Sequence, residues 1–198
     1  VAHEINNPLS GVVDSVKLMQ RLTAGDEVPR ERMADFRTYL GHVVTETERC
    51  ARIVRDLLVF ARRSSPTHEP TDFNDIVRRT LSVINHRLEL GEVTPQLELD
   101  GDLPRVTCDA SQMQQIVTNL VLNAAEAMET GRVTIRTRAD HGRGFVILEV
   151  SDTGSGIAPE HLARIYDPFF STKKEGQGTG LGLAVVYGIV NAHGGQID

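Results

Sequence analysis

Two glycine-rich boxes, DTGSGI at residues 152–157 and GTGLGL at 178–183, are the segments most able to do chemistry. Glycine has no Cβ, so the backbone there can turn sharply or approach a ligand closely. Either box alone is also typical of an ordinary turn. Both follow an apolar stretch that carries two asparagines, Asn119 and Asn123. The combination predicts a pocket for a phosphate-bearing ligand.

Asn119 and Asn123 are four residues apart, so on a helix they point in the same direction. A buried polar pair on an apolar helix is costly unless a partner satisfies it. A magnesium ion with phosphates is one such partner, because an amide oxygen is a hard ligand for a hard cation. The alternative is an asparagine pair that binds only local backbone.

A second candidate for chemistry is His3, with Glu4 beside it and Asn7 one helical turn away. The apolar positions Ala2 and Ile5 leave His3 on the flank of the helix, open to another domain. A neutral imidazole is a competent nucleophile near pH 7. Without further context, ordinary polar residues on a helix surface remain the alternative.

His3 lies at the start of a predicted helical hairpin, residues 1–65. Apolar residues recur at steps of three and four in residues 1–22 and again in 36–61, and residues 23–30 are polar with Gly25 and Pro29. The predicted seam consists of Ala2, Ile5, Leu9, Val12, Val16 and Met19, then Phe36, Leu40, Val43, Thr47, Cys50, Val54, Leu57 and Ala61. One hairpin cannot bury this seam alone, which favours a homodimeric four-helix bundle.

The nucleotide motifs belong to a mixed α/β region, residues 71–198, after a polar linker at 66–70 that contains two prolines. Asp72 is the expected cap of the first helix. Helices are predicted for 72–88, 111–128, 159–166 and 183–192, and strands for 93–99, 133–138 and 145–150. A glycine-bearing turn at 141–144 joins the last two strands.

Composition excludes several classes of protein. A net charge of −6 argues against a general nucleic-acid binder. No run of eighteen apolar residues exists, so this segment is not expected to contact a membrane. Cys50 and Cys108 are isolated, so neither a zinc site nor a disulfide framework is indicated, and reduced cytoplasmic thiols are expected.

The motifs HEINNPL (3–9), NLVLNAAEAM (119–128), DTGSGI, DPFFSTK (167–173) and GTGLGLAVVYGIV (178–190) occur in an order that resembles the transmitter core of two-component sensor histidine kinases. The resemblance covers nearly the whole chain. It implies an all-α hairpin that dimerises as a four-helix bundle, followed by an α/β sandwich that binds ATP on a mixed sheet. It also implies an upstream sensory module and a full-length protein that is cytoplasmic or tethered to a membrane.

The resemblance implies that His3 is phosphorylated from ATP and passes the phosphoryl group to an aspartate of a response-regulator receiver domain. By the same resemblance, Glu4 orients or deprotonates the imidazole, and Asn7 positions water to dephosphorylate the partner.

For the nucleotide, the family pattern makes Asn123 a Mg²⁺ ligand assisted by Asn119, and makes Asp152 the acceptor for the adenine amino group. Residues 169–176 are expected to form a lid, in which Lys173 either reaches the phosphates or is simply solvated. The remaining expected nucleotide contacts are Gly154, Gly156, Phe169, Phe170, Lys173, Gly178, Gly180, Leu181 and Gly182.

Two other functions remain open on the sequence: an ATP hydrolase of the same superfamily, and a catalytically silent dimerisation scaffold. A hydrolase of this superfamily carries a glutamate where Asn119 stands, and a serine kinase of the anti-sigma type lacks a histidine hairpin. Two departures from the family are noted. Glu126 stands where many members have lysine, and members normally add strands after Asp198, so the domain is expected to be truncated.

Overall fold

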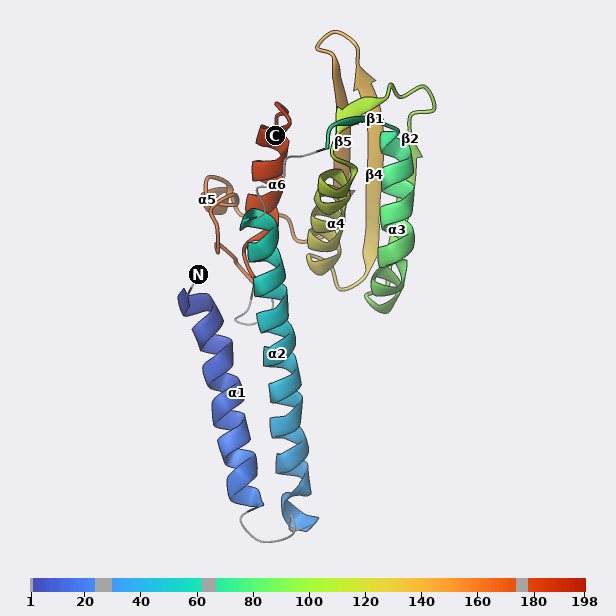
Figure 1. The fold of residues 1–198 in the computed structure, drawn as a ribbon. Coiled ribbons are helices and arrows are strands. Elements are labelled where there is room, and N and C mark those ends of the chain that lie inside the picture. Colours follow the sequence, from blue (N-terminus) through green and yellow to red (C-terminus); the bar gives the residue numbers. More distant parts are fainter. Residues whose placement is uncertain (1, 24–29, 62–66, 174–177) are drawn as a thin grey trace. The chain divides into compact units, whose positions relative to one another are not determined.

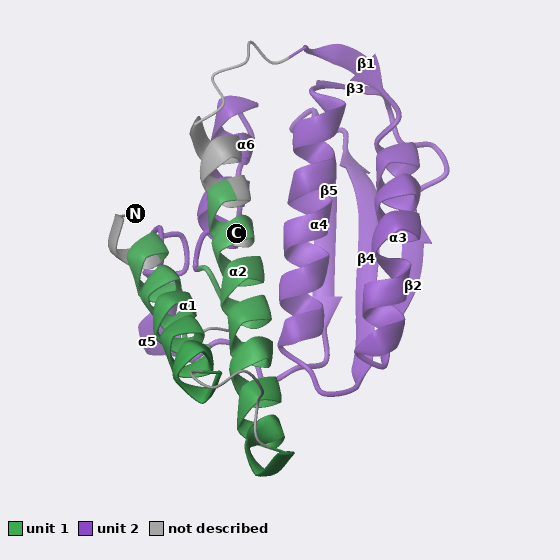
Figure 2. Ribbon diagram, turned by 60° about the horizontal axis from the view of Figure 1, so that its bottom comes forward, with its two compact units in different colours: residues 1–62, 171–179 green, residues 63–170, 180–198 purple. Residues whose placement is uncertain are grey.

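The structure is a computed structural model that describes residues 2–23, 30–61, 67–173 and 178–198, except for the side chains of 2–4, 52 and 55–61. The chain divides into two compact units, residues 1–62 with 171–179 and residues 63–170 with 180–198 (Figure 2).

The first unit is built on a helical hairpin, as predicted (Figure 1). Helix α1 (Ala2–Leu22) is followed by a short 3-10 turn, η1 (Arg30–Arg32), and by helix α2 (Met33–Ala61). Residues 24–29 of the predicted turn lie outside the described residues.

Within a single hairpin, the predicted seam is covered only in part. Pro8 and Ser15, which were not assigned to it, are buried, and so is Ile53. Six apolar side chains are 39–50% exposed, namely Leu9, Val13, Val16, Leu40, Val44 and Val54. Each helix therefore has two adjacent apolar stripes. One of them is buried or half-buried within the hairpin. Periodicity alone does not tell which neighbour each stripe faces.

The second unit is an α/β domain with a mixed sheet, which confirms the predicted fold class. Strands β2 (Val93–Leu99) and β4 (Gly131–Asp140) are parallel, and β4 pairs antiparallel with β5 (Phe145–Asp152) in the order β2-β4-β5. Helices α3 (Phe73–Leu90) and α4 (Ala110–Glu126) cover one face of this sheet, and α6 (Gly182–Ala192) packs on α4 (Figures 1 and 2).

Two short strands were not predicted. Strand β1 (Glu69–Thr71) pairs antiparallel with β3 (Val106–Cys108), so the predicted linker at 66–70 overlaps a strand in its last two residues. Three residues are too few to produce a periodic signal, and Pro70 argued against a strand. Helix α5 (Pro159–Leu162) is also shorter than the predicted 159–166.

Alternation along β4 separates the two faces of the sheet. Val133 and Ile135 are fully buried beneath the helices, together with Val77, Val117, Val121 and Val186. Thr137 continues this face and donates a buried 2.7 Å hydrogen bond to the amide oxygen of Asn74 on α3. Asp72 caps α3 as expected, accepting a hydrogen bond from the Asp75 amide.

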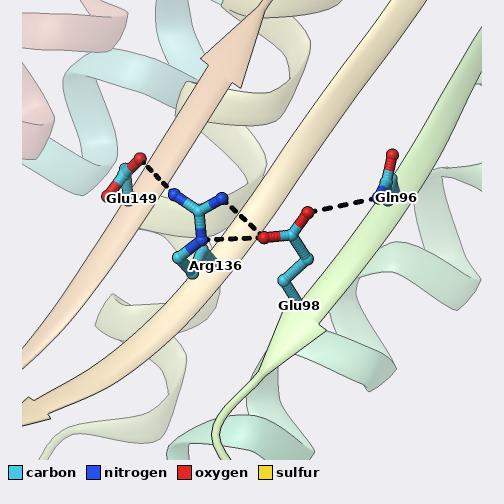
Figure 3. Close-up of polar contacts among 4 residues, drawn as sticks. All are labelled: Gln96, Glu98, Arg136 and Glu149. Atoms are coloured by element: carbon cyan, nitrogen blue, oxygen red, sulfur yellow. Dashed lines mark hydrogen bonds and ion pairs between the residues drawn. The ribbon is translucent and has the colours of Figure 1, made fainter.

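Arg136 points from β4 to the opposite face (Figure 3). Its guanidinium lies 2.8 Å from Glu98 on β2 and 2.8 Å from Glu149 on β5. Hydrogen bonds and charge from Glu98, with the charge of Glu149, raise the pKa of Arg136. These ion pairs join the three strands on their polar face.

Candidate functional site

The site is built on α4, because Asn119 and Asn123 lie half-buried on the side of this helix that meets the start of α6. The Asn119 side-chain amide donates to the Gly182 carbonyl at 3.3 Å. A Cβ added to Gly182 would lie 3.4 Å from the Asn123 amide nitrogen. The structure therefore brings these three predicted residues together, and a Cβ at position 182 would be in van der Waals contact with Asn123.

The first turn of α6 adds backbone donors to the same place. Its N-cap residue, Leu181, is buried, and among the residues that the structure describes no side-chain hydrogen bond caps this end of the helix. Amide groups in the first turn of a helix have no acceptor within the helix and, with the helix dipole, favour an anion. The arrangement suits a phosphate group next to Asn119 and Asn123.

The DTGSGI box is attached to the C-terminal end of α4. Asp152 ends β5 and accepts a 2.8 Å hydrogen bond from the Gly154 amide. A Cβ on Gly154 would lie only 2.6 Å from the Ala127 carbonyl oxygen, so this close approach requires glycine. Gly156 has φ +70°, which also favours glycine. Asp152 itself is exposed.

Thr153 supports this box and was not predicted. Its hydroxyl accepts from the Arg132 amide at 3.3 Å and lies 3.3 Å from the Met128 sulfur. Gly131 has φ +157°, and a Cβ there would meet the Thr153 hydroxyl at 2.6 Å. No local pattern in the sequence indicates this contact, because it joins two segments about twenty residues apart.

The first residue of the predicted lid is joined to the second glycine box. The Phe169 amide donates to the Gly180 carbonyl at 2.9 Å. Phe169 has φ +69° and Gly180 has φ +65°. A Cβ on Gly180 would overlap the Phe169 backbone. Gly180 of the second glycine box therefore closes the loop that begins at Phe169.

Phe170 is held by neighbours that the sequence did not suggest. The Arg164 guanidinium lies 4.4 Å from the centre of its ring, and the His161 ring lies 5.6 Å away. Tyr166 stacks on Tyr187 of α6 at 5.1 Å. Burial, followed by the charges of Asp198 and Tyr187, raises the pKa of Tyr166. The segment after α5 is thus anchored to α6 by aromatic contacts.

The remaining predicted residues belong to the unit that contains the hairpin. Among them are Lys173, whose amide donates to the Ser171 hydroxyl at 3.2 Å, and Gly178. Residues 174–177 lie outside the described residues, as do the side chains of His3 and Glu4. Asn7 is exposed on α1.

The donor set fits a magnesium nucleotide better than a metal held by protein alone. Within the described ranges, no group of three or more His, Cys, Asp or Glu side chains is placed to hold a metal ion. An amide oxygen from Asn123 with phosphate oxygens matches the preference of Mg²⁺ for few protein ligands and substrate phosphates.

Among the residues that the structure describes, no helix is long and apolar enough to span a bilayer.

Comparison with known proteins agrees with this geometry. Residues 1–66 match the His Kinase A (phospho-acceptor) domain, and residues 108–198 match the histidine kinase-, DNA gyrase B-, and HSP90-like ATPase. The chain belongs to the two-component sensor histidine kinases. It comprises their transmitter core.

Individual relatives cover different parts of this core. The sensor histidine kinase ZraS of Salmonella typhi is 35% identical over all of this chain, which spans 40% of that protein's length. Full-length ShkA in complex with AMPPNP is 27% identical with a TM-score of 0.68, covering 98% of this chain and 40% of that one. The nucleotide-free catalytic domain of ThkA is 30% identical with a TM-score of 0.53, covering 61% of this chain and 77% of that one.

Proposed function

We propose that this transmitter core phosphorylates its own His3 from Mg²⁺-ATP and then transfers the phosphoryl group to an aspartate of a response-regulator receiver domain. The observation that carries the proposal is the packing of Asn119 and Asn123 of α4 against Gly182 at the uncapped start of α6. That ShkA was captured with an ATP analogue supports the choice of nucleotide.

Each element of the site has a role in this proposal. Asn123 holds Mg²⁺ through its amide oxygen, and the ion neutralises charge on the phosphates when bound. The first-turn amides of α6 bind phosphate oxygens. Asp152 accepts from the adenine amino group, while Gly154 and Gly156 let the backbone pass close to the base. Lys173, from the lid segment, adds positive charge near the phosphates.

The transfer step needs positioning more than covalent help. An imidazole nitrogen of His3 attacks the γ-phosphorus in line, so that an N–P bond forms while the bond to the β-phosphate oxygen breaks and ADP leaves. Glu4 takes up the imidazole proton, a form of general-base assistance typically worth about 10²–10⁴ in rate. The phosphoryl group then passes to the receiver carboxylate. Asn7 positions water for removal of that phosphoryl group later.

Incubation with γ-labelled ATP and Mg²⁺ tests the acceptor. Wild-type protein is expected to take up label that is stable in base and labile in acid, which is characteristic of a phosphoramidate. His3→Gln is expected to take up none, because it lacks the nucleophilic nitrogen. His42→Gln on α2 is the matched control and should label as the wild type does. Undiminished label in His3→Gln would place the acceptor elsewhere.

An ATP hydrolase is the less favoured alternative. Asn119 occupies the position where hydrolases of this superfamily carry a glutamate, and its amide already donates to the Gly182 carbonyl. A carboxamide does not take up a proton near neutral pH, so it cannot activate water as a general base. Steady release of phosphate by His3→Gln at the wild-type labelling rate would favour hydrolysis instead.

We further propose that the hairpin forms a homodimeric four-helix bundle. The six exposed apolar side chains of α1 and α2 form the stripe that a second hairpin would cover. A bundle of this kind is expected to expose His3 on its flank to the nucleotide domain.

A further inference from the structure

His193, the residue that follows α6, lies half-buried between two backbone groups. Its Nδ1 atom is 2.9 Å from the Ile189 carbonyl oxygen, one turn back in α6. Its Nε2 atom is 3.3 Å from the amide nitrogen of Asp109. One imidazole therefore connects the end of α6 with the residue that precedes α4.

The two partners determine the protonation state of the ring. A carbonyl oxygen can only accept a hydrogen bond, so Nδ1 must carry the hydrogen. A backbone amide can only donate, so Nε2 must present a lone pair. Both bonds exist together only in the neutral Nδ1–H tautomer of His193.

Asp109 is free to offer its backbone amide because it stands outside the helix that it caps. Its carboxylate accepts from the Ser111 and Gln112 amides at 2.9 and 3.2 Å, and from the Ser111 hydroxyl. Burial alone would raise the pKa of this carboxyl, but these hydrogen bonds outweigh it and hold the pKa below its ordinary value. The carboxylate thus caps α4 and also accepts a hydrogen bond from the Thr67 backbone, whereas the amide nitrogen donates to His193.

Helix α6 is consequently joined to α4 at both of its own ends. At one end, the Asn119 amide binds the Gly182 carbonyl. At the other, His193 binds the Asp109 amide. The two points on α6 are separated by about 16 Å of helix rise. Because Gly182 packs against Asn123, any slide of α6 along α4 would change the spacing between the second glycine box and the asparagine pair.

A second histidine, His68, brings the start of the nucleotide domain into contact with His193. The His68 ring lies 4.9 Å from the His193 ring, tilted by 59°. His68 directly precedes β1, which pairs with β3, and β3 ends at Cys108 next to Asp109. The titratable groups that these elements bring around His193 are the His68 imidazole, the Asp109 carboxylate and the Cys108 thiol. Burial raises the pKa of that thiol, so it is uncharged near neutral pH.

We propose that His193 is a positioning residue for nucleotide binding. As a neutral Nδ1–H imidazole, it holds α6 in register with α4. Through its contact with His68, it also positions the chain that enters β1. The inference rests on the nucleotide-binding part of the proposed function. It predicts a dependence on pH, because a protonated ring has a second N–H that faces the Asp109 amide instead of accepting from it. Acid therefore removes the bond, and a rise in pH restores it.

Three variants separate this role from simple packing. His193→Phe keeps a ring for His68 to contact but removes both polar atoms. His193→Gln retains an acceptor that does not titrate. His86→Phe, on the exposed face of α3, is the matched control for loss of a histidine. Binding of a fluorescent N-methylanthraniloyl-ADP with Mg²⁺ is measured for each between about pH 8 and 5.5, the range in which histidines generally titrate.

We expect His193→Phe to raise the Kd on the order of tenfold at pH 8, the size of effect that follows loss of one partly buried hydrogen bond. His193→Gln should stay within about threefold of wild type. The Kd of the wild type divided by the Kd of His193→Gln should rise toward acid pH. Because both proteins bind the same nucleotide, titration of the nucleotide itself cancels in this ratio. Equal affinities for His193→Phe and wild type would overturn the inference, as would a flat ratio.

The tautomer provides a readout that needs no nucleotide. Long-range ¹H–¹⁵N spectra of the imidazoles should show His193 as Nδ1–H at neutral pH, and detection of Nε2–H would overturn the inference. Unchanged far-UV circular dichroism confirms that His193→Phe is folded. If His193→Phe does not fold, the pH dependence of nucleotide binding by His193→Gln relative to wild type tests the inference. Nucleotide binding without label on His3 would sink the proposed acceptor but leave this inference standing, whereas absence of nucleotide binding in the wild type would overturn both.

Discussion

At the scale of single residues, Asn123 is the side chain whose loss should separate binding of metal from binding of adenine. It lies within contact distance of Gly182 and one helical turn before Ala127, whose carbonyl meets the DTGSGI box. Its amide oxygen is the expected Mg²⁺ ligand.

We predict that Asn123→Ala lowers the autophosphorylation rate by roughly a hundredfold or more, comparable to the loss of one essential charge-stabilising group. Asn191→Ala, exposed near the end of α6, should leave the rate unchanged. The rate is measured with γ-labelled ATP at saturating Mg²⁺. A rate within threefold of wild type for Asn123→Ala would contradict its assignment as the metal ligand.

Gly180 presents a different single-residue problem, because backbone geometry rather than chemistry requires it. Its φ of +65° and its contact with the Phe169 backbone leave no room for a side chain. We predict that Gly180→Ala destabilises the nucleotide domain by about 1–3 kcal/mol. It should also raise the KM for ATP, since the base of the lid must shift.

The matched control is Gly188→Ala on α6, where a Cβ meets nothing within 4 Å. Alanine at an unhindered helix position is expected to stabilise by about 0.5–1 kcal/mol. Urea unfolding and ATP-dependent labelling are measured for both variants. Similar effects of the two substitutions would show that the contact between Gly180 and Phe169 does not matter.

At the scale of the secondary structure elements, α4 organises the nucleotide domain. Its N-terminus is capped by Asp109, its middle carries the asparagine pair, and its C-terminal Ala127 carbonyl meets the DTGSGI box. All the pieces of the site that the structure brings together are attached to this helix or to α6 beside it. The stability of α4 should therefore depend on its cap.

We predict that Asp109→Ala costs about 1 kcal/mol of unfolding free energy at pH 7, the usual effect of losing an N-cap side chain. Folding lowers the pKa of this carboxyl, so its contribution is complete at pH values above the unfolded pKa. That contribution is lost as the pH falls through the folded pKa. The difference between variant and wild type should accordingly shrink in acid.

Urea denaturation at several pH values between about 7 and 3 checks this prediction. Asp102→Ala, in the exposed turn before β3, is the control and should show a much smaller difference at pH 7. A cost of Asp109→Ala that stayed constant down to pH 3 would mean that the carboxylate does not act through its charge.

At the scale of the whole molecule, autophosphorylation requires a residue of one unit to reach a nucleotide held by the other. His3 belongs to the hairpin and Asn123 to the α/β domain. The proposed reaction therefore uses residues of both units. The hairpin also needs a partner, because its second apolar stripe is exposed in a single chain.

We predict that the protein sediments as a dimer at micromolar concentration and that Val44→Asp shifts it to monomer, since a charge in that stripe would have to be buried. Val83→Asp, on the outer face of α3, replaces a valine that is 76% exposed and should leave the dimer intact. Sedimentation equilibrium distinguishes the two. A wild-type monomer would contradict the bundle.

Much of this protein could be predicted from short stretches of sequence. The motif order identified the family, the spacing of Asn119 and Asn123 placed both on one side of a helix, and alternation located β4 and β5. These are local properties, since a helix or strand imposes its period on neighbours along the chain.

Only the tertiary structure decided which residues from distant segments meet. The Ala127 carbonyl explains why position 154 is glycine, Phe169 explains position 180, and the Asp109 amide gives His193 a partner 84 residues away. It also decided which apolar stripe of α1 is buried within the hairpin. No periodicity encodes such contacts, because they depend on how whole elements pack, and packing is determined by the summed fit of many side chains rather than by any one motif.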